Sequence, residues 1–349
     1  MIYEFEDLLA LVQKCEPVSK LLDKKVSLRT QFEDTYFSSG EVENFFASMD
    51  INWYEIKDSK TDFSYKFFSV LVDYSINGQH YRQQLLFKVF YEKELISKMY
   101  ITLDNDENIK RIKCVVSYDG SKYFGYQKQP LNKTIQEDIE KVLTNIHQNQ
   151  TNIYSSGRTD KGVHAINQVF HFDTNLSIEP KKWTSILNTY LSDYIHVKDS
   201  VLVDKTFHSR YDSLVKEYMY KINLYEYNPI QKDYELYVKG IDVEVFTKQA
   251  SMLIGEHDFR SFSKVDIKKD TVRTITDVKV ITKDDYLYFY IQGNGFMRYM
   301  VRNIVGALID ISTKKTDLNI LDILEAKSRN SAKNTAFAGG LYLNEVKYK

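Results

Sequence analysis

The spacing of hydrophobic residues changes period along the chain, and each period predicts a different kind of element. Residues 4–49 have mostly helical spacing, as in FEDLLALV and EVENFFASM. A strand period follows, because FSVLVDYSI and QHYRQQLLFKVF both alternate and flank Asn77-Gly78. This pair suits a type I′ turn, in which both central residues have positive φ. The first part of the chain is therefore predicted to contain helices and then a β-hairpin.

From Lys110 onward, strand-like and helix-like segments are mixed. Thr134 and Glu137 have the spacing of a capping box ahead of an apolar stripe, which predicts a helix over TIQEDIEKVLTNI. The stripe consists of Ile135, Ile139, Val142 and Ile146. Two more helices are predicted, at residues 243–254, ended by Gly255, and in YMVRNIVGALIDI. The predicted strands are RIKCVVSYDG, NQVFHFDT, EYMYKINLY, DYLYFYIQG and GGLYLNEVKY. This mixture in two similar halves favours an α+β fold.

A short charged segment, DNDENIK at residues 104–110, separates the two parts. Such a polar stretch between apolar segments is typical of a linker. We therefore expect an N-terminal α+β domain over residues 1–106, a linker at 107–110, and two halves of a further unit at 111–206 and 207–349. The order of elements in the N-terminal domain resembles the cone-shaped α+β fold of the steroid-isomerase and SnoaL kind. No catalytic residues stand out in it.

Composition favours a globular protein without a membrane span. The 349 residues are 43% hydrophobic and 27% charged, and no run of about 18 apolar residues occurs. The acidic start MIYEFEDLLALVQ lacks the basic region of a secretory signal. Cys15 and Cys114 are too few for a disulfide scaffold and too far apart for a zinc knuckle. We therefore expect a cytoplasmic protein in a reducing compartment.

The net charge of −1 hides an asymmetry along the chain. Residues 1–110 carry 13 Lys and Arg against 19 Asp and Glu, a net of −6. Residues 111–349 carry 34 against 29, a net of +5. Because positive charge attracts a phosphate backbone, the later part is the one suited to nucleic acid.

The segment SSGRTDKGVHAINQVFHF places a Gly, an Arg and Asp160 within four positions, just ahead of a predicted strand. One interpretation is a tight turn, in which Gly157 and Gly162 bend the chain and Asp160 caps it. A second is metal binding by Asp160 and His164, although no His, Cys or Glu cluster lies nearby in the sequence. The spacing of the glycines is not a P-loop, because the Lys-Ser/Thr pair is missing.

The residue sequence GRTDKGVHA is more specific than a tight turn or a metal-binding pair would require. It resembles the signature of the tRNA pseudouridine synthase A family, which contains the catalytic aspartate. Five further blocks resemble family motifs in the same order, and the six run collinearly over about residues 111–349. The five are YDGSKYFGYQKQ at 118–129, FHSRYDSLVKEYMY at 207–220, LIGEHDFRSF at 253–262, GFMRYMVRNIVGAL at 295–308 and GGLYL at 339–343.

The resemblance implies an isomerase that converts uridine to pseudouridine in tRNA, with uridines 38, 39 or 40 of the anticodon stem-loop as expected targets. It also implies two ferredoxin-like halves around a central antiparallel sheet, a homodimer, a tRNA partner, and neither metal nor cofactor. Asp160 carries over as the catalytic carboxylate. It acts either as a nucleophile at the anomeric carbon or as a base at the neighbouring sugar carbon, and the sequence leaves both roles open.

Three further site residues carry over from the resemblance. Arg302 matches the arginine that pairs with the aspartate, and its charge should reverse the tendency of a buried carboxyl to hold its proton. Arg158 matches the arginine associated with displacing the target nucleotide from its stem. Tyr218 matches the ring that stacks on the uracil, although Tyr220 faces the same side of the strand. Further candidates for RNA contacts are His208, Arg210, Lys161, Lys122 and Lys128.

Two other functions remain open. A non-catalytic tRNA-binding or tRNA-folding protein could keep the same cleft, but it has little reason to retain Asp160 beside Arg158 and Tyr218. The N-terminal domain is not needed by the family's core. It could bind an unknown protein partner, stabilise the dimer, guide substrate choice or carry a separate activity. Tyr126 and Ser192, where the family usually has Trp and often Pro, affect local packing only.

Overall fold

The chain folds as two compact units, Met1–Ile109 and Lys110–Lys349. The computed structural model describes residues 8–10, 22–30, 49–62, 65–76, 79–92, 95–103, 109–263 and 270–348. Within these ranges, no helix is both long and apolar enough to cross a lipid bilayer.

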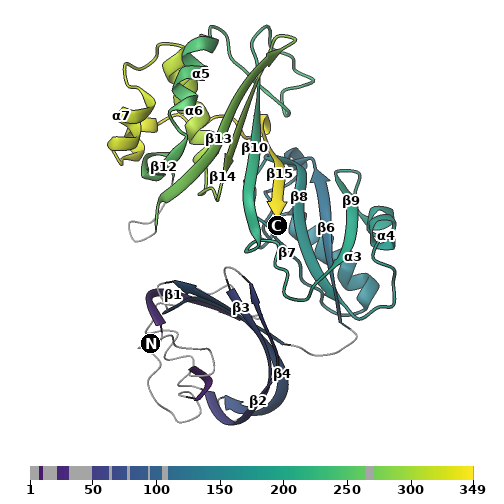
Figure 1. The fold of residues 1–349 in the computed structure, drawn as a ribbon. Helices are drawn as coiled ribbons and strands as arrows, with labels where there is room; N and C mark the ends of the chain where they lie inside the picture. The colour runs from purple at the N-terminus through teal and green to yellow at the C-terminus, as the bar shows by residue number, and fades with distance from the viewer. Residues whose placement is uncertain are drawn as a thin grey trace. The chain divides into compact units, whose positions relative to one another are not determined.

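The N-terminal unit contains a five-stranded sheet whose strands are visibly curved (Figure 1). The strands are β1 (Leu22–Thr30), β2 (Met49–Asp62), β3 (Tyr65–Ile76), β4 (Gln79–Glu92) and β5 (Leu95–Leu103), in the order β1-β5-β4-β3-β2. Only the β1–β5 pair is parallel. Val70 and Val72 of β3 are buried, as are Leu85, Phe87 and Val89 of β4. Their spacing of two residues places each set on one face of its strand.

The N-terminal elements agree only in part with the hydrophobic pattern. The mostly helical prediction for residues 4–49 is wrong at Leu22–Thr30, which forms β1. Pairing with β5 supplies the backbone hydrogen bonds there, and such tertiary pairing overrides local propensity. Most of EVENFFASM lies outside the described residues, and its last residue, Met49, begins β2. The predicted hairpin is confirmed, because Ile76 pairs with Gln79 across Asn77-Gly78.

The C-terminal unit is built on one ten-stranded sheet. Its main path runs β12-β13-β14-β10-β15-β8-β6-β9, with β11 beside β10 and β7 beside β8. The strands are β6 (Lys110–Tyr118), β7 (Tyr154–Ser155), β8 (His164–Thr174), β9 (Ile195–Val203), β10 (Ser213–Asn223), β11 (Leu236–Tyr237), β12 (Gly255–Asp258), β13 (Val272–Lys283), β14 (Tyr286–Gly293) and β15 (Leu341–Tyr348). The α+β prediction is confirmed.

The sequence-based expectation was a central antiparallel sheet, but the observed sheet also contains parallel pairs. Both β15–β8 and β10–β11 are parallel pairs. The β15–β8 pair joins the sheet of the first half to that of the second, because Tyr342 and Leu343 align with His164 and Ala165. The loop that precedes β8 therefore lies next to strands that come from the far end of the chain.

Helices pack against the strands at both ends of this sheet (Figure 1). The α-helices are α3 (Ile135–His147), α4 (Lys182–Tyr190), α5 (Val243–Ser251), α6 (Met300–Ser312) and α7 (Ile320–Glu325). Short 3-10 helices occupy Gly120–Lys122, Phe259–Phe262, Arg329–Ala332 and Ala338–Gly340. Thr134 caps α3 by accepting a hydrogen bond from the Glu137 N–H, as its spacing predicts. Nearly all of α6 is buried, which makes this helix a firm support for side chains in its first turn.

Candidate active site

Asp160 lies on the loop between β7 and β8, and neighbouring groups fix that loop from both sides. The Thr159 hydroxyl hydrogen-bonds to the Tyr118 hydroxyl at 2.8 Å, and the Thr159 carbonyl accepts from the Tyr126 N–H at 3.1 Å. The Asp160 carbonyl accepts from the Val163 N–H at 3.1 Å, which closes a turn. The predicted turn is therefore present, with Gly162 at a φ of +81°, but the Asp160 side chain pairs with Arg302 instead of capping the turn.

Gly125 allows this loop to pack closely against the segment after β6. Its φ is +100°, and a Cβ atom there would lie 3.0 Å from the Thr159 carbonyl oxygen and 3.2 Å from the Lys161 nitrogen. A side chain would be strained and would push the loop away. The second glycine of the YDGSKYFGYQKQ block thus allows the backbone of the Asp160 loop to lie close to it.

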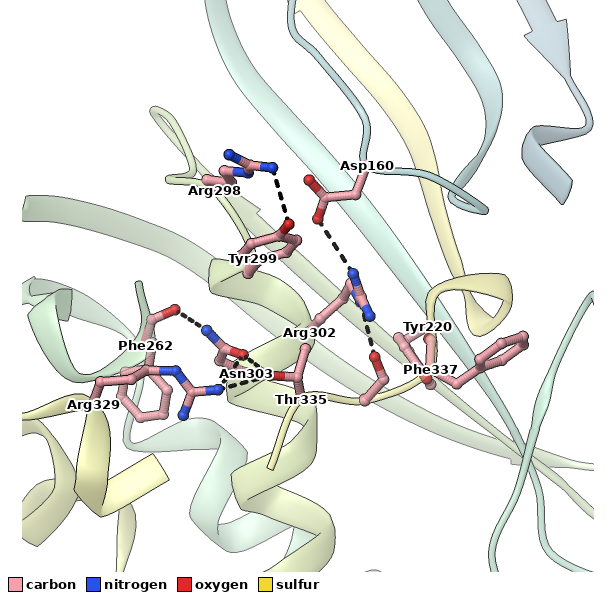
Figure 2. A network of polar contacts seen from close by, with 11 residues as sticks. Asp160, Tyr220, Phe262, Arg298, Tyr299, Arg302, Asn303, Arg329, Thr335 and Phe337 are labelled. Carbon is pink, nitrogen blue, oxygen red and sulfur yellow. Dashed lines mark hydrogen bonds and ion pairs between the residues drawn. The ribbon is translucent and has the colours of Figure 1, made fainter. Parts of the chain in front are cut away.

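The Asp160 carboxylate pairs with Arg302, which comes from the first turn of α6 (Figure 2). The Asp160 Oδ2 to Arg302 Nη1 distance is 3.4 Å, and the two side chains are 23% and 15% exposed. Arg302 Nε donates to the Ala336 carbonyl at 2.8 Å, and the Ala336 N–H donates to the Arg302 carbonyl at 3.0 Å. These two bonds orient the guanidinium toward the carboxylate.

A second polar network holds the Ala336 segment against α6 (Figure 2). Asn303, which is buried, donates to the Phe262 carbonyl at 2.7 Å. Its side-chain oxygen accepts from Arg329 Nη2 at 2.9 Å and from the Thr335 hydroxyl at 2.7 Å. Because buried hydrogen-bonded networks rigidify their surroundings, this one stabilises the segment that orients Arg302.

Two residues ahead of α6 add positive charge and an aromatic ring beside the pair. Tyr299 caps the helix with a φ of +63°, which is unusual for a non-glycine residue. Its hydroxyl accepts from Arg298 Nη2 at 3.0 Å, and its ring centroid lies 5.5 Å from the Arg302 guanidinium carbon. The ring therefore keeps Arg298 and Arg302 on the same side as Asp160 (Figure 2).

Burial and the nearby arginines have opposite effects on the pKa of Asp160. Burial raises the pKa of its carboxyl, whereas the charges of Arg302 and then Arg298, with the Arg302 hydrogen bond, lower it. Burial wins, so the pKa lies above its ordinary value in the free protein. The expectation that a guanidinium reverses the effect of burial is therefore wrong: the arginines oppose protonation of Asp160 without outweighing burial.

Tyr218 lies on β10, and its side chain is buried with its ring edge-on to Phe296 at 5.1 Å. Burial raises the pKa of its hydroxyl, and the charges of Tyr118 and Asp160 raise it further. The phenol is therefore protonated and lies within the electrostatic reach of Asp160. Tyr220 faces the same way, but its hydroxyl donates to the Phe337 carbonyl at 2.6 Å. That bond gives the Tyr220 hydroxyl a structural role. Tyr218 is therefore the better candidate for the ring that acts near the Asp160 carboxylate.

The structure also places the other predicted residues. Arg158 is exposed on the Asp160 loop, and His208 and Arg210 are partly exposed on the loop before β10. Lys161 is exposed, with its ammonium 3.9 Å from the centroid of the Phe124 ring. The exposed Lys122 lies 6.0 Å from the Tyr194 ring, and Lys128 pairs with Glu140 at 3.5 Å. The RNA contacts of these residues stay predictions.

His164 has a structural position rather than the geometry of a metal ligand. Its Nδ1 accepts from the Gly120 N–H at 3.1 Å, which leaves Nε2–H to donate to the Asp233 carbonyl at 2.9 Å. Burial lowers its pKa, in agreement with a neutral ring. Within the described ranges, no group of three or more His, Cys, Asp or Glu side chains is arranged to hold a metal ion.

Comparisons with known proteins bear on the same part of the chain. A family model described as tRNA pseudouridine synthase matches residues 114–212 and 250–349. The tRNA pseudouridine synthase A of Shouchella clausii is 42% identical over 245 residues, which cover 69% of this chain and 94% of that protein. The tRNA pseudouridine synthase A of Geobacillus is 42% identical, and the match covers 68% of this chain and 98% of that protein.

Among solved structures, an NTF2-like protein from Cytophaga hutchinsonii is 15% identical. It covers 30% of this chain and 95% of its own, with a TM-score of 0.24, which does not establish a fold. The family model and the two relatives are decisive, because they span most of the C-terminal unit and nearly the whole of each relative. The chain belongs to the tRNA pseudouridine synthase family.

Proposed function

We propose that the protein isomerises uridine to pseudouridine in tRNA, with Asp160 as the catalytic group. The observation that supports this most directly is the Asp160–Arg302 pair, in which a carboxylate and a guanidinium 142 residues apart in the sequence come into contact near Tyr218. The family match supplies the reaction. The proximity of these side chains supports a part for each of the three in it.

The reaction breaks the bond between C1′ and N1 of uridine and forms one between C1′ and C5. The hydrogen on C5 leaves as a proton and N1 gains one, so the atoms and charge balance without an external reactant. Asp160 in its ionised form either attacks C1′ or removes a proton from C2′. Both roles require a carboxylate, and Arg302 favours that form. Tyr218 offers an aromatic face to the displaced uracil.

The finer expectations belong to the same proposal. The target uridines are 38, 39 or 40 of the anticodon stem-loop, reached after Arg158 displaces the nucleotide from its stem. The working form is a cytoplasmic homodimer bound to tRNA, with two ferredoxin-like halves in each subunit. A net charge of +5 over residues 111–349 supports RNA binding by this unit. For the N-terminal unit, the proposal is a cone-shaped fold that binds an unknown protein partner.

A map of product positions tests this function. The purified protein is incubated with an unmodified tRNA transcript that contains uridines at 38, 39 and 40, and pseudouridines are located by chemical-modification sequencing. We expect product at one or more of these sites. A matched transcript with cytidine at the three positions should give none. Tight binding to the transcript without any product would instead favour the non-catalytic tRNA-binding alternative.

Removal of residues 1–109 tests the role of the N-terminal unit. The remaining unit contains every site residue and its own hydrophobic core, so its catalytic efficiency should stay within a few-fold of the full chain. Initial rates of pseudouridine formation measure this. A soluble, folded truncation without activity would mean that the N-terminal unit participates in catalysis or in tRNA binding.

A further inference from the structure

Lys216 lies on β10, two residues before Tyr218, and its side chain reaches under the start of the Asp160 loop. Its Nζ donates to the Ser156 carbonyl at 2.5 Å. A Cβ atom built on Gly157 would lie 3.8 Å from the same nitrogen. The ammonium therefore lies beside the backbone that leads directly into Arg158 and Asp160.

The surrounding polar groups hold this backbone in place without using the charge of Lys216. The Ser156 N–H donates to the Val169 carbonyl at 2.8 Å, and the Ser156 hydroxyl donates to Gln168 Oε1 at 2.6 Å. Gln168 Nε2 donates to the Gly157 carbonyl at 3.0 Å. Both Ser156 and Gln168 are fully buried. The loop is thus already anchored by neutral groups.

The charge of Lys216 has no negative partner in the described part of the chain. No carboxylate lies within 4.0 Å of its Nζ there, and its one hydrogen bond is to the neutral Ser156 carbonyl. Burial, together with the smaller effect of the nearby positive charge of Arg210, lowers the pKa of Lys216 to about 8. An enclosed cation without a counter-ion destabilises the free protein, and a bound anion relieves that effect. The side chain is still partly exposed, so an anion can approach it.

We propose that Lys216, together with Arg210, binds a phosphate of the RNA substrate next to the target uridine. This inference rests on the proposed function. RNA carries one negative charge per nucleotide. When the loop places Arg158 and Asp160 at one nucleotide, the adjacent phosphate comes close to the start of the loop, at Ser156 and Gly157. A phosphate there accepts hydrogen bonds from the remaining N–H groups of the Lys216 ammonium and is attracted by the charge of Arg210. The site fixes the backbone from which the uridine is displaced.

Charge variants of Lys216 test the proposal. Lys216→Gln keeps a donor for the Ser156 carbonyl but removes the charge, Lys216→Met removes both, and Lys216→Arg keeps the charge. Lys248→Met, at an exposed position of α5, is the matched control. The dissociation constant for an unmodified tRNA transcript is measured from low to moderate KCl concentration, with kcat and KM measured at one salt concentration. Thermal melting confirms that each variant is folded.

The neutral variants should bind tRNA about tenfold more weakly, and the slope of log Kd against log salt should fall by about 0.7 to 0.9, the value for one lost phosphate contact. KM should rise while kcat changes little. Lys216→Arg and Lys248→Met should keep the wild-type slope. A wild-type slope and affinity in folded Lys216→Gln would overturn the proposal and reduce Lys216 to a loop anchor. Failure of the proposed function would appear separately, as a wild-type protein that makes no pseudouridine.

Discussion

Replacement of Asp160 by asparagine is expected to reduce pseudouridine formation by at least about 10⁴-fold. Asparagine has the same shape and can still contact Arg302, but it is neutral and acts neither as a nucleophile nor as a base. Binding should stay within a few-fold of wild type, because phosphate contacts elsewhere supply most of the affinity for RNA. Product mapping by sequencing and a filter-binding titration with the same tRNA transcript measure the two quantities.

The same variant should be more stable than wild type at neutral pH. The folded-state pKa of Asp160 is raised, so the folded protein holds this proton more tightly than the unfolded chain does. Its contribution to stability is therefore present below the unfolded pKa and is lost as pH rises through the folded pKa. Asp160→Asn removes the destabilising charge and should raise the melting temperature at pH 7.

Asp199→Asn is the matched control for that measurement. Its pKa is lowered, mainly by the hydrogen bond from Lys181, so the ionised Asp199 stabilises the folded protein slightly. Removing it should leave the melting temperature unchanged or lower it by a small amount, since the pair is largely exposed. An Asp160→Asn protein that melts below wild type at pH 7 would contradict the balance described for this carboxyl.

Replacement of Arg302 by glutamine should have the next largest effect. Arg302 is the strongest influence that lowers the pKa of Asp160, and after its loss only the smaller effect of Arg298 opposes burial. The pH at which kcat/KM falls on the acidic side of its pH profile, its acid limb, should rise by about one to three units. The rate at pH 7 should fall about 100-fold or more, as is usual when a charge-stabilising donor is lost from an active site. Rates from pH 5 to 9 measure both changes.

Arg298→Gln is the control for the Arg302 result. Arg298 also lowers the pKa of Asp160, but less than Arg302 does, so its acid limb should shift in the same direction by a smaller amount. Arg302→Lys should recover part of the shift, because it keeps the charge but loses the bond to the Ala336 carbonyl. An unchanged acid limb in a folded Arg302→Gln protein would show that this pair does not control the ionisation of Asp160.

The sequence predicts the elements whose determinants are local. The Asn77-Gly78 hairpin and the Thr134 cap of α3 both follow from residues within a few positions of each other. The strand Leu22–Thr30 was mistaken for helix because its hydrogen bonds come from β5, about seventy residues later. The strands β9 and β13 belong to the C-terminal sheet but were not among the predicted elements, although Ile195 and Val197 of β9 and Val278 and Val280 of β13 alternate with polar residues.

The candidate site shows the same division. Asp160 and Arg302 are 142 residues apart, so no spacing rule pairs them, and only the resemblance of their motifs did. Arg298 could have been found as a second arginine four positions before Arg302 in the same block. Arg329 gave no signal, because its role depends on the fold bringing it to Asn303. Lys216 also gave none, since an uncompensated charge becomes visible only when the surroundings of the ammonium are known.

Single-turnover tritium release tests the central claim most directly. A tRNA transcript labelled at C5 of uridine is mixed with an excess of protein, and tritium leaves for water only when C5 forms its bond to C1′. Wild-type protein should release label from the modified positions in one rapid phase. Asp160→Asn, under conditions in which it binds all of the tRNA, should release none above background. Release by this variant at a rate close to wild type would contradict the assignment of the reaction to Asp160.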